Sequence, residues 1–293
     1  MGTPFTEASP PPKPLTLNKA CNLADFRHSE LVDPLKQALG FPDIFGPAWP
    51  AGSEDRKFWE IGMALLTMQR HVPVDRRVAA LGVGAGLEPT SFIFTKYFDR
   101  VFATDLYGSG GWRSDTPRKM LTKPEQCAGP VPFDRRRLVV QHMNALDLRY
   151  EDNSFDFIYS SSSIEHFGSP GAIGQAAAEM GRVLRPGGIL SLSTEFRCRG
   201  TDEWPRKSTF VFDNRSLQEL VVKPSGCRPI DSPDFSISQE TLDHPTEFWK
   251  ALLDLKLKRK KGTLQGRWSV YPHIVIGHRA LKWTSVHLAL RKP

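Results

Sequence analysis

The stretch VAALGVGAGLEPTSFIFTKYFDRVFATD, residues 78–105, decides the fold of this chain. It opens with a short apolar run from Val78 to Leu81 and passes through three glycines in a GxGxG spacing. A helical pattern from Leu87 to Phe98 follows, and a second apolar run closes on Asp105. Strand, glycine-rich turn, helix and second strand in this order make a βαβ unit. The sequence therefore predicts an α/β fold.

The glycines of this unit indicate a ligand site. Gly82, Gly84 and Gly86 let the backbone turn tightly and approach a ligand where a Cβ would intrude. Asp105 lies about 20 residues past the loop, where a carboxylate can accept hydrogen bonds from both hydroxyls of a ribose. The same spacing also occurs in ordinary loops, so a plain turn stays as the alternative.

The residues after the third glycine favour one kind of nucleoside. A dinucleotide fold places a further glycine at position 87, where the helix approaches a pyrophosphate, and this chain has Leu87 there. Glu88 near the helix start would repel a pyrophosphate. The pattern favours a nucleoside without phosphates, such as S-adenosylmethionine (SAM), over NAD.

Several motifs together resemble those of class I SAM-dependent methyltransferases. They are the glycine loop, Asp105, the run Asn144-Ala145-Leu146-Asp147, the run 155–158 (FDFI) and the run 182–188 (RVLRPGG). The resemblance implies a Rossmann-like sheet of seven strands, the last antiparallel, with helices on both faces. It implies SAM contacts from Gly82, Gly84, Gly86, Asp105, Leu106, Asn144, Ala145, Leu146 and Ser161.

One position departs from that family pattern. The family usually carries an acidic residue two positions before the first glycine, and this chain has Ala80. Glu88 is a substitute candidate for holding the methionine amino group. The departure also keeps open a SAM-binding protein without catalysis.

The run SSSSIEHFG, residues 160–168, follows the strand predicted at 155–159. In open α/β sheets the ligand lies beyond the carboxyl ends of the strands, so this run should line the cleft. We predict Glu165 and His166 as catalytic residues and Ser162 as a substrate contact. A histidine can remove the proton of an attacking hydroxyl. Alternatively, Glu165 and His166 only fix the loop by hydrogen bonding.

Further substrate contacts are predicted at Glu195 and Arg197, which follow the strand 189–193, and at Trp112 in a glycine-rich loop. Arg197 would suit a phosphate or carboxylate. Trp112 could equally anchor its loop. Glu165, His166 and Glu195 are candidate ligands should Mg²⁺ take part, although no spacing establishes a metal site.

The reaction predicted from these residues is O-methylation of a small polar acceptor. The chain resembles bacterial methyltransferases of polysaccharide and glycolipid biosynthesis, which makes a sugar or oligosaccharide hydroxyl the first expected acceptor. Another natural product, RNA or protein is the alternative. RNA binding would need a continuous basic stripe with stacking aromatics, so no nucleic-acid partner is expected.

Composition sets wider bounds on the chain. Its 293 residues carry a formal charge of +7, a mild excess of basic residues. The densest basic run, KLKRKK at 256–261, is either an anion or membrane-surface contact or a solvated helix end. Four dispersed cysteines without zinc spacing, no run long enough to span a membrane and no secretory signal predict a cytoplasmic protein. The oligomeric state cannot be read from the sequence.

The predicted organisation has three parts. Residues 1–19 form a disordered proline-rich tail, residues 20–52 an N-terminal cap segment, and residues 53–293 the catalytic domain, with insertions at 107–136 and 239–272 near the substrate cleft. Helices are predicted at 34–39, 53–69, 87–98, 170–184, 213–222 and 248–257, and further strands at 138–141, 155–159, 189–193, 230–237, 274–277 and 284–290.

Overall fold

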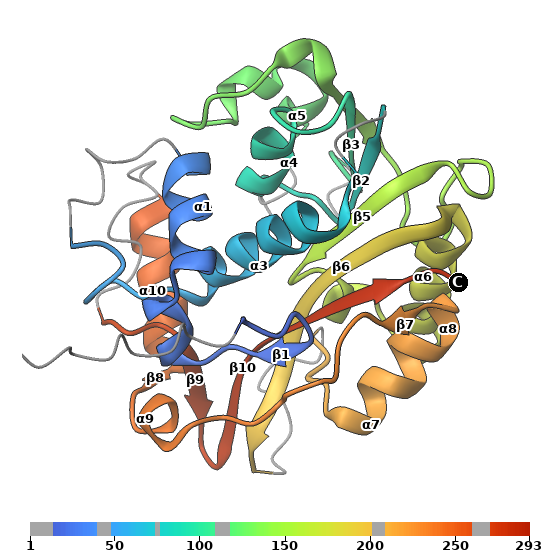
Figure 1. The fold of residues 1–293 in the computed structure, drawn as a ribbon. Helices are drawn as coiled ribbons and strands as arrows, with labels where there is room; N and C mark the ends of the chain where they lie inside the picture. Colours follow the sequence, from blue (N-terminus) through green and yellow to red (C-terminus); the bar gives the residue numbers. More distant parts are fainter. Residues whose placement is uncertain (1–13, 40–47, 74–76, 109–117, 201–208, 260–269) are drawn as a thin grey trace, which may run out of the picture.

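One mixed β-sheet organises the chain (Figure 1). The computed structural model describes residues 14–39, 48–73, 77–108, 118–200, 209–259 and 270–293. Within them the sheet runs in the order β4–β3–β2–β5–β6–β10–β9–β8. The first five strands pair in parallel, and β10 pairs antiparallel with β6. These strands are β2 (Ala79–Val83), β3 (Arg100–Asp105), β4 (Leu138–His142), β5 (Phe155–Ser161), β6 (Leu184–Arg199) and β10 (Leu281–Arg291). The predicted α/β sheet with an antiparallel last strand is confirmed.

Short strands extend the far edge of β10. The described residues contain ten paired strands where seven were expected. The short strands are β1 (Lys19–Ala20), β7 (Arg228–Pro229), β8 (Pro245–Glu247) and β9 (Val275–His278), of which β9 matches the strand predicted at 274–277. β1, β7 and β9 each pair with a different part of β10, because β10 is eleven residues long and each partner is short.

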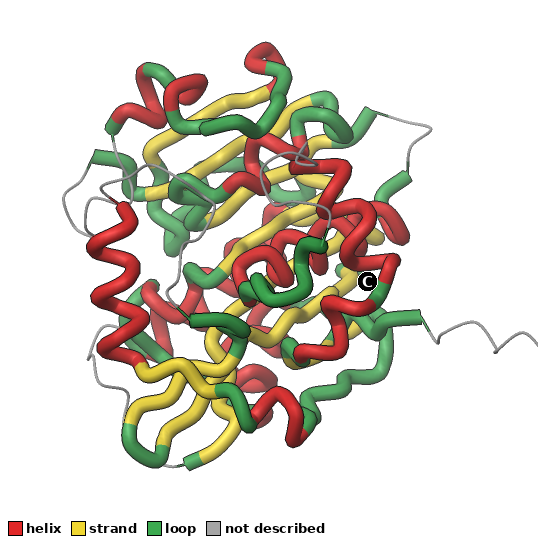
Figure 2. Tube along the Cα trace, turned by 90° about the vertical axis from the view of Figure 1, so that its left-hand side faces the viewer, coloured by secondary structure: helices red, strands yellow, loops and turns green. Residues whose placement is uncertain are grey.

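Helices cover both faces of the sheet, as predicted. Side chains alternate across a strand, so neighbours enter different cores. Ala80 packs in a cluster with α1 (Ser29–Leu39), α3 (Arg56–His71) and α4 (Pro89–Phe94), whereas Leu81 packs in a cluster with α6 (Pro170–Val183). Figure 1 shows α3 and α6 on opposite sides of the strands, and Figure 2 shows helices lying against the strands in the turned view.

The remaining helical segments are short or peripheral. They are η1 (Leu23–Arg27), α5 (Lys119–Thr122), η2 (Pro124–Gln126), η3 (Arg135–Arg137), η4 (Ile164–His166), α7 (Asn214–Leu217), the π-helix η5 (Gln218–Val222), α8 (Lys223–Ser225), α9 (Gln239–Leu242) and α10 (Phe248–Arg259). In the described part of the chain, no helix is long and apolar enough to cross a membrane.

The predicted disordered tail extends too far. Leu17 and Asn18 are buried, and β1 begins at Lys19. The Asn18 amide nitrogen donates to the carbonyl of Ala289 at 3.1 Å, and the Ala289 N–H donates to the Asn18 Oδ1 at 3.0 Å. This side chain completes the hydrogen bonding of β10, so the chain is ordered before residue 20. Residues 1–13 of the predicted tail lie outside the described residues.

The strand predicted at 230–237 is wrong. The N-terminal segment occupies the edge of β10 where that strand was expected: Lys19 pairs with His287 on one side and forms a bridge with Asp234 on the other. Asp231 accepts the backbone N–H groups of Leu17 at 2.6 Å and Asn18 at 3.0 Å. These contacts replace a regular ladder between residues 230–237 and β10.

Candidate functional site

The glycine loop joins β2 to α4 and is held by backbone contacts. Gly84 and Gly86 have φ values of +64° and +46°, in the left-handed region where glycine is favoured. The Gly84 carbonyl accepts a hydrogen bond of 2.7 Å from the Ser163 hydroxyl, which fixes the loop against the end of β5.

Two of these glycines are required by packing within the fold. A Cβ on Gly82 would lie 2.5 Å from the Tyr159 hydroxyl, and a Cβ on Gly84 would lie 2.6 Å from the Ser163 Cβ. We had interpreted the glycines as leaving room for a ligand. The structure adds a second reason, because protein side chains already occupy the space where these two Cβ atoms would stand.

Asp105 lies at the end of β3, directly beside the glycine loop. Its carboxylate accepts the backbone N–H of Gly86 at 2.8 Å and that of Leu106 at 2.6 Å. Burial raises the pKa of Asp105, and these two hydrogen bonds, with the charge of His142, oppose the rise. The carboxylate is therefore held in one orientation at the carboxyl end of the sheet and can still accept hydrogen bonds from a diol.

Two apolar side chains next to Gly86 and Asp105 in the sequence are exposed. Leu87 and Leu106 are 40% and 38% exposed, although most large apolar side chains nearby are buried. After β4, the N–H of Leu146 donates to the Asn144 Oδ1 at 3.0 Å, which shapes the predicted 144–146 turn. Ala145 is half-buried and belongs to the edge of the core. Gly82, Gly84, Gly86, Asp105, Leu106 and the 144–146 turn thus follow the carboxyl ends of three neighbouring strands.

A buried charge network lies at the start of α3. Glu60 is fully buried and lies 3.0 Å from the Lys57 ammonium, which in turn lies 3.5 Å from the Glu88 carboxylate. Arg56 forms an ion pair with Glu195 on β6 and lies 3.3 Å from the Ser285 hydroxyl. Helix α3 thereby connects the glycine loop to the middle of the sheet.

The network favours the charged forms of Glu60 and Lys57. Burial alone would raise the pKa of Glu60, but the charges of Lys57 and Arg56, with hydrogen bonds from Ser285 and Lys57, lower it below the ordinary value. Burial opposes ionisation of Lys57 as well, yet the charges of Glu60 and Glu88 raise its pKa. A buried cation flanked by two carboxylates can exchange one of them for a ligand carboxylate without becoming unpaired.

Glu165 differs from the other carboxyl groups. It is 1% exposed, and burial, followed by the nearby charge of Glu195, raises its pKa to about 8. The Thr194 hydroxyl donates to its Oε2 at 2.7 Å, whereas its Oε1 is buried without a hydrogen-bond partner in the described structure. Burial therefore favours the neutral form of Glu165, in which a carboxyl group can donate a hydrogen bond.

His166 follows directly on η4. Its Nε2 lies 3.9 Å from the Glu165 Oε1, and its Nδ1 lies 3.2 Å from the Thr209 hydroxyl. Ser161 is buried at the end of β5, and Ser162, at a φ of +44°, donates to the Glu60 Oε1 at 2.8 Å. The predicted run thus lies at the carboxyl end of the sheet, where it joins the charge network.

The two predicted contacts on β6 are placed differently from the prediction. We expected the strand to end at residue 193, but β6 continues to Arg199. Glu195 and Arg197 stand within it, opposite Ser285 and Trp283 of β10. Glu195 forms an ion pair with Arg56, and Arg197 donates a hydrogen bond to the carbonyl of Gly200 at 3.0 Å. Trp112 lies outside the described residues.

The proposed metal ligands do not form a metal site. No group of three or more His, Cys, Asp or Glu side chains among the described residues is arranged to hold a metal ion. Glu195 is paired with Arg56, and burial raises the pKa of Glu165, which disfavours the charged form that a metal ligand needs. A role for Mg²⁺ finds no support in this ligand set.

Sequence reasoning missed Glu60 and Ser285. Glu60 stands among apolar residues of a helix, and nothing in the pattern shows that it is buried. Ser285 lies in an apolar strand far away in sequence. The available signal was the helical spacing of the polar positions 56, 57 and 60.

Comparisons with known proteins agree with this geometry. Residues 81–192 match the family model described as "Methyltransferase domain". A curated protein of Aspergillus luteorubrus, named probable methyltransferase ltbC, is 27% identical over 113 residues, which are 38% of this chain and 38% of that protein. The chain therefore matches about two fifths of the length of this relative.

Solved structures show the same fold at low identity. A protein of Galdieria sulphuraria, named as a sarcosine dimethylglycine methyltransferase, is 17% identical with a TM-score of 0.56, over 88% of this chain and 96% of that one. The [4+2]-cyclase SpnF is 22% identical with a TM-score of 0.52, over 92% and 95%. The chain therefore has the Rossmann-like α/β fold of class I methyltransferases, and residues 81–192 are the part that matches the methyltransferase model.

Proposed function

We propose that this protein is a SAM-dependent O-methyltransferase acting on a hydroxyl of a small polar acceptor, with a sugar as the first candidate. One observation carries the proposal. At the carboxyl end of β5, the buried Glu165 Oε1 has no hydrogen-bond partner among the described residues, and the His166 Nε2 lies 3.9 Å from it. A buried donor beside a histidine suits a ligand that both donates and accepts hydrogen bonds, as a hydroxyl does.

The residues around the loop fit SAM. Asp105 would bind the ribose hydroxyls, because its carboxylate is fixed and only partly saturated by two backbone N–H groups. Leu87, Leu106 and the 144–146 turn would cover the adenine, since apolar side chains stand exposed there. Lys57 and Glu88, 3.5 Å apart, would pair with the carboxylate and the amino group of the methionine end, the role predicted for Glu88 alone.

In the proposed reaction the cofactor supplies the methyl group, and side chains of the protein orient and deprotonate the acceptor. Bound SAM supplies a methyl group on a sulfonium, which is a strong electrophile. The neutral Glu165 carboxyl would donate to the acceptor oxygen and orient it. His166, held by Thr209 at its Nδ1, would take the hydroxyl proton at its Nε2. Ser161 and Ser162 would line the acceptor side of the cleft.

Two competing activities lead to different measurements. The fold is shared with a protein named as a cyclase, and Ala80 replaces the usual acidic residue, so SAM binding without methyl transfer is the main alternative. Methylation of another natural product, RNA or protein is the other. The first alternative predicts no labelled product, and the second predicts a labelled product other than a sugar methyl ether.

The test begins with calorimetric titration of the purified chain with SAM and with NAD, with and without Mg²⁺. Micromolar SAM binding without NAD binding is expected. SAM labelled in its methyl group is then incubated with a panel of sugars, with phenols, amines and RNA as the other arms. Label in a sugar methyl ether supports the proposal. SAM binding with no labelled product across the panel contradicts the catalytic part, and absence of SAM binding contradicts the whole.

A further inference from the structure

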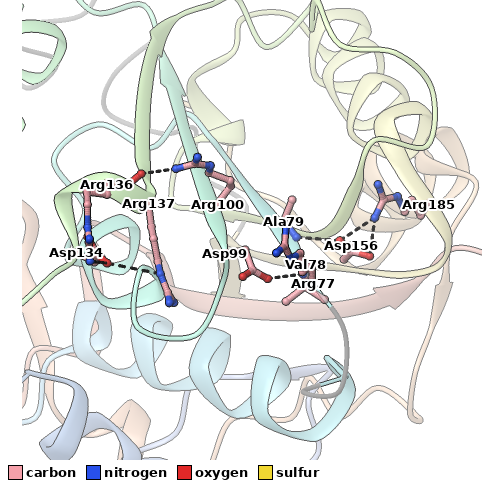
Figure 3. A pocket seen from close by; sticks show the side chains of 10 residues that line it. All are labelled: Arg77, Val78, Ala79, Asp99, Arg100, Asp134, Arg136, Arg137, Asp156 and Arg185. Atoms are coloured by element: carbon pink, nitrogen blue, oxygen red, sulfur yellow. Dashed lines mark hydrogen bonds and ion pairs between the residues drawn. The ribbon is translucent and has the colours of Figure 1, made fainter.

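We propose a second binding site, for a small polyphosphorylated anion, at the opposite end of the sheet from the SAM crevice. A pocket of about 570 Å³ opens there (Figure 3). It is formed where five neighbouring parallel strands begin, whereas the candidate crevice lies where they end. Its lining residues are Arg77, Val78, Ala79, Asp99, Arg100, Asp134, Arg136, Arg137, Asp156 and Arg185.

The topology of the sheet brings the arginines together. Arg77 precedes β2, Arg100 is the first residue of β3, and Arg185 is the second residue of β6. Arg136 and Arg137 belong to η3, immediately before β4. In Figure 3, Arg100, Arg136 and Arg137 lie on one side of the pocket and Arg185 on the other, with the start of β2 between them.

Each of the three aspartates of the pocket accepts a hydrogen bond from a backbone N–H group of the protein. Asp99 accepts the N–H of Val78 at 3.0 Å, and Asp156 accepts the N–H of Ala79 at 2.8 Å. Asp134 accepts the N–H of Arg136 at 2.9 Å. Because these carboxylates fix the strand and helix starts, they remain in place when a ligand binds.

Three of the five arginines have N–H groups to spare, namely Arg77, Arg100 and Arg136, although the Arg136 Nε also donates to Asp134 at 3.3 Å. The other two are bound within the protein: Arg185 pairs with both oxygens of Asp156 at 3.0 Å, and Arg137 donates to the carbonyls of Thr95 and Phe98. Within the described part of the chain, the Arg77 side chain has no hydrogen bond or ion pair, and it is exposed. The Arg136 side chain is 90% exposed, and Arg100 donates only to a backbone carbonyl, that of Arg136. Five arginines against three aspartates leave an excess of two positive charges around one cavity. A planar guanidinium with free N–H groups binds phosphate oxygens in pairs.

The size and lining of the pocket select the ligand. Cavities of about 300–1,000 Å³ hold small molecules, so this one is larger than a single phosphate needs. Single-stranded nucleic acid would be expected to stack its bases on aromatic side chains, and none of the ten lining residues is aromatic. A chain of two or more phosphates matches both the charge and the spread of the arginines.

The test is a calorimetric titration of the full chain with tripolyphosphate at low ionic strength, without SAM. We expect saturable binding to one site that weakens at least about tenfold in Arg77→Gln and further in Arg77→Gln/Arg136→Gln. Arg215→Gln on α7 removes the same charge from another exposed place and should change the affinity less than twofold. Arg77 has no partner to lose, so its variant should fold, which circular dichroism checks.

Several results would overturn this site. They are no binding of tripolyphosphate, equal binding by the wild type and both Arg77 variants, or an equal loss in Arg215→Gln. Inorganic phosphate binding as tightly as tripolyphosphate would contradict the polyphosphate requirement. If a single-stranded RNA binds more tightly than tripolyphosphate, and the arginine variants lose RNA binding but keep tripolyphosphate binding, the ligand is a nucleic acid instead. Since SAM is absent throughout, the outcome is independent of methyl transfer.

Discussion

The Ser162 hydroxyl donates a hydrogen bond of 2.8 Å to the Glu60 carboxylate across 102 residues of sequence. The same carboxylate oxygen accepts a hydrogen bond from the Ser285 hydroxyl on β10, and the other oxygen pairs with Lys57. One fully buried carboxylate therefore joins α3, the end of β5 and the antiparallel strand. The walls of the candidate cleft are positioned relative to one another through Glu60.

Replacing Glu60 with glutamine should destabilise the fold. The amide still accepts a hydrogen bond, but the buried Lys57 loses the nearer of its two carboxylate partners and keeps only Glu88 at 3.5 Å. We expect a loss of about 2 kcal/mol in the free energy of unfolding, measured by urea denaturation. Glu219→Gln, at an exposed pair with Lys223, is the control and should leave the midpoint unchanged. Equal midpoints for wild type and Glu60→Gln would contradict the proposed role of the network.

Asp105→Asn should weaken SAM binding at least about tenfold. Asparagine keeps one acceptor oxygen for a backbone N–H but removes the charge and the second acceptor. Calorimetric titration measures the dissociation constant directly. Asp243→Asn, exposed at the end of α9, is the matched control and should bind as the wild type does. If both variants bind SAM equally well, the ribose contact assigned to Asp105 is wrong.

The stability of the protein should fall as the pH rises from about 4.5 to about 8 through Glu165. Its pKa is raised from an ordinary 4.5 to about 8 in the folded state. Over this range the folded protein keeps a proton that the unfolded chain has released, so the slope of unfolding free energy against pH is negative. Glutamine imitates the neutral form, and Glu165→Gln should therefore gain stability relative to wild type as the pH rises.

This dependence is measured by urea unfolding at several pH values. The difference between Glu165→Gln and wild type is smallest near pH 5 and largest near pH 8. Glu151→Gln, at an exposed turn, is the control, and its difference from wild type should stay constant. A constant difference for Glu165→Gln as well would mean that Glu165 is ionised in the fold.

The sequence was sufficient for the sheet and for placing Asp105 beside the glycine loop, because both depend on local patterns. Gly84 and Asp105 stand at fixed positions of one βαβ unit, and their spacing predicts where they meet. The parallel strands were found for the same reason, since each is a short apolar run between turn residues.

The surroundings of Glu60 depend on contacts between distant segments. Glu60 resembles any polar residue of a surface helix until Ser162 and Ser285 are brought to it from other strands. The 230–237 run alternates like a strand, yet Asp231 binds the N–H groups of Leu17 and Asn18 and leaves the edge of β10 to β1. Neither set of contacts can be predicted from the local sequence pattern, because the partners lie far apart in the chain.

His166→Asn should lower the turnover of methyl transfer about 100-fold while leaving the SAM dissociation constant unchanged. The substitution removes the base but lies outside the groups assigned to SAM. Thr209→Val removes only the partner of Nδ1, so we expect a smaller loss and a shifted pH profile. Labelled methyl transfer to the acceptor found by screening gives both rates. Unchanged turnover in His166→Asn would reduce His166 to a structural residue of its loop.

Gly84→Ala and Gly187→Ala separate backbone strain from close packing. Both glycines have positive φ, +64° and +77°, so alanine costs about 1–2 kcal/mol of strain at either position. A Cβ at position 187 meets nothing within 4 Å, whereas one at position 84 would lie 2.6 Å from the Ser163 Cβ. Urea unfolding should therefore show Gly84→Ala less stable than Gly187→Ala by at least about 1 kcal/mol. Because a shift of Ser163 also moves the loop beside Asp105, Gly84→Ala alone should weaken SAM binding. Equal effects of the two variants would mean that the loop tolerates a Cβ and that the contact with Ser163 does not position it.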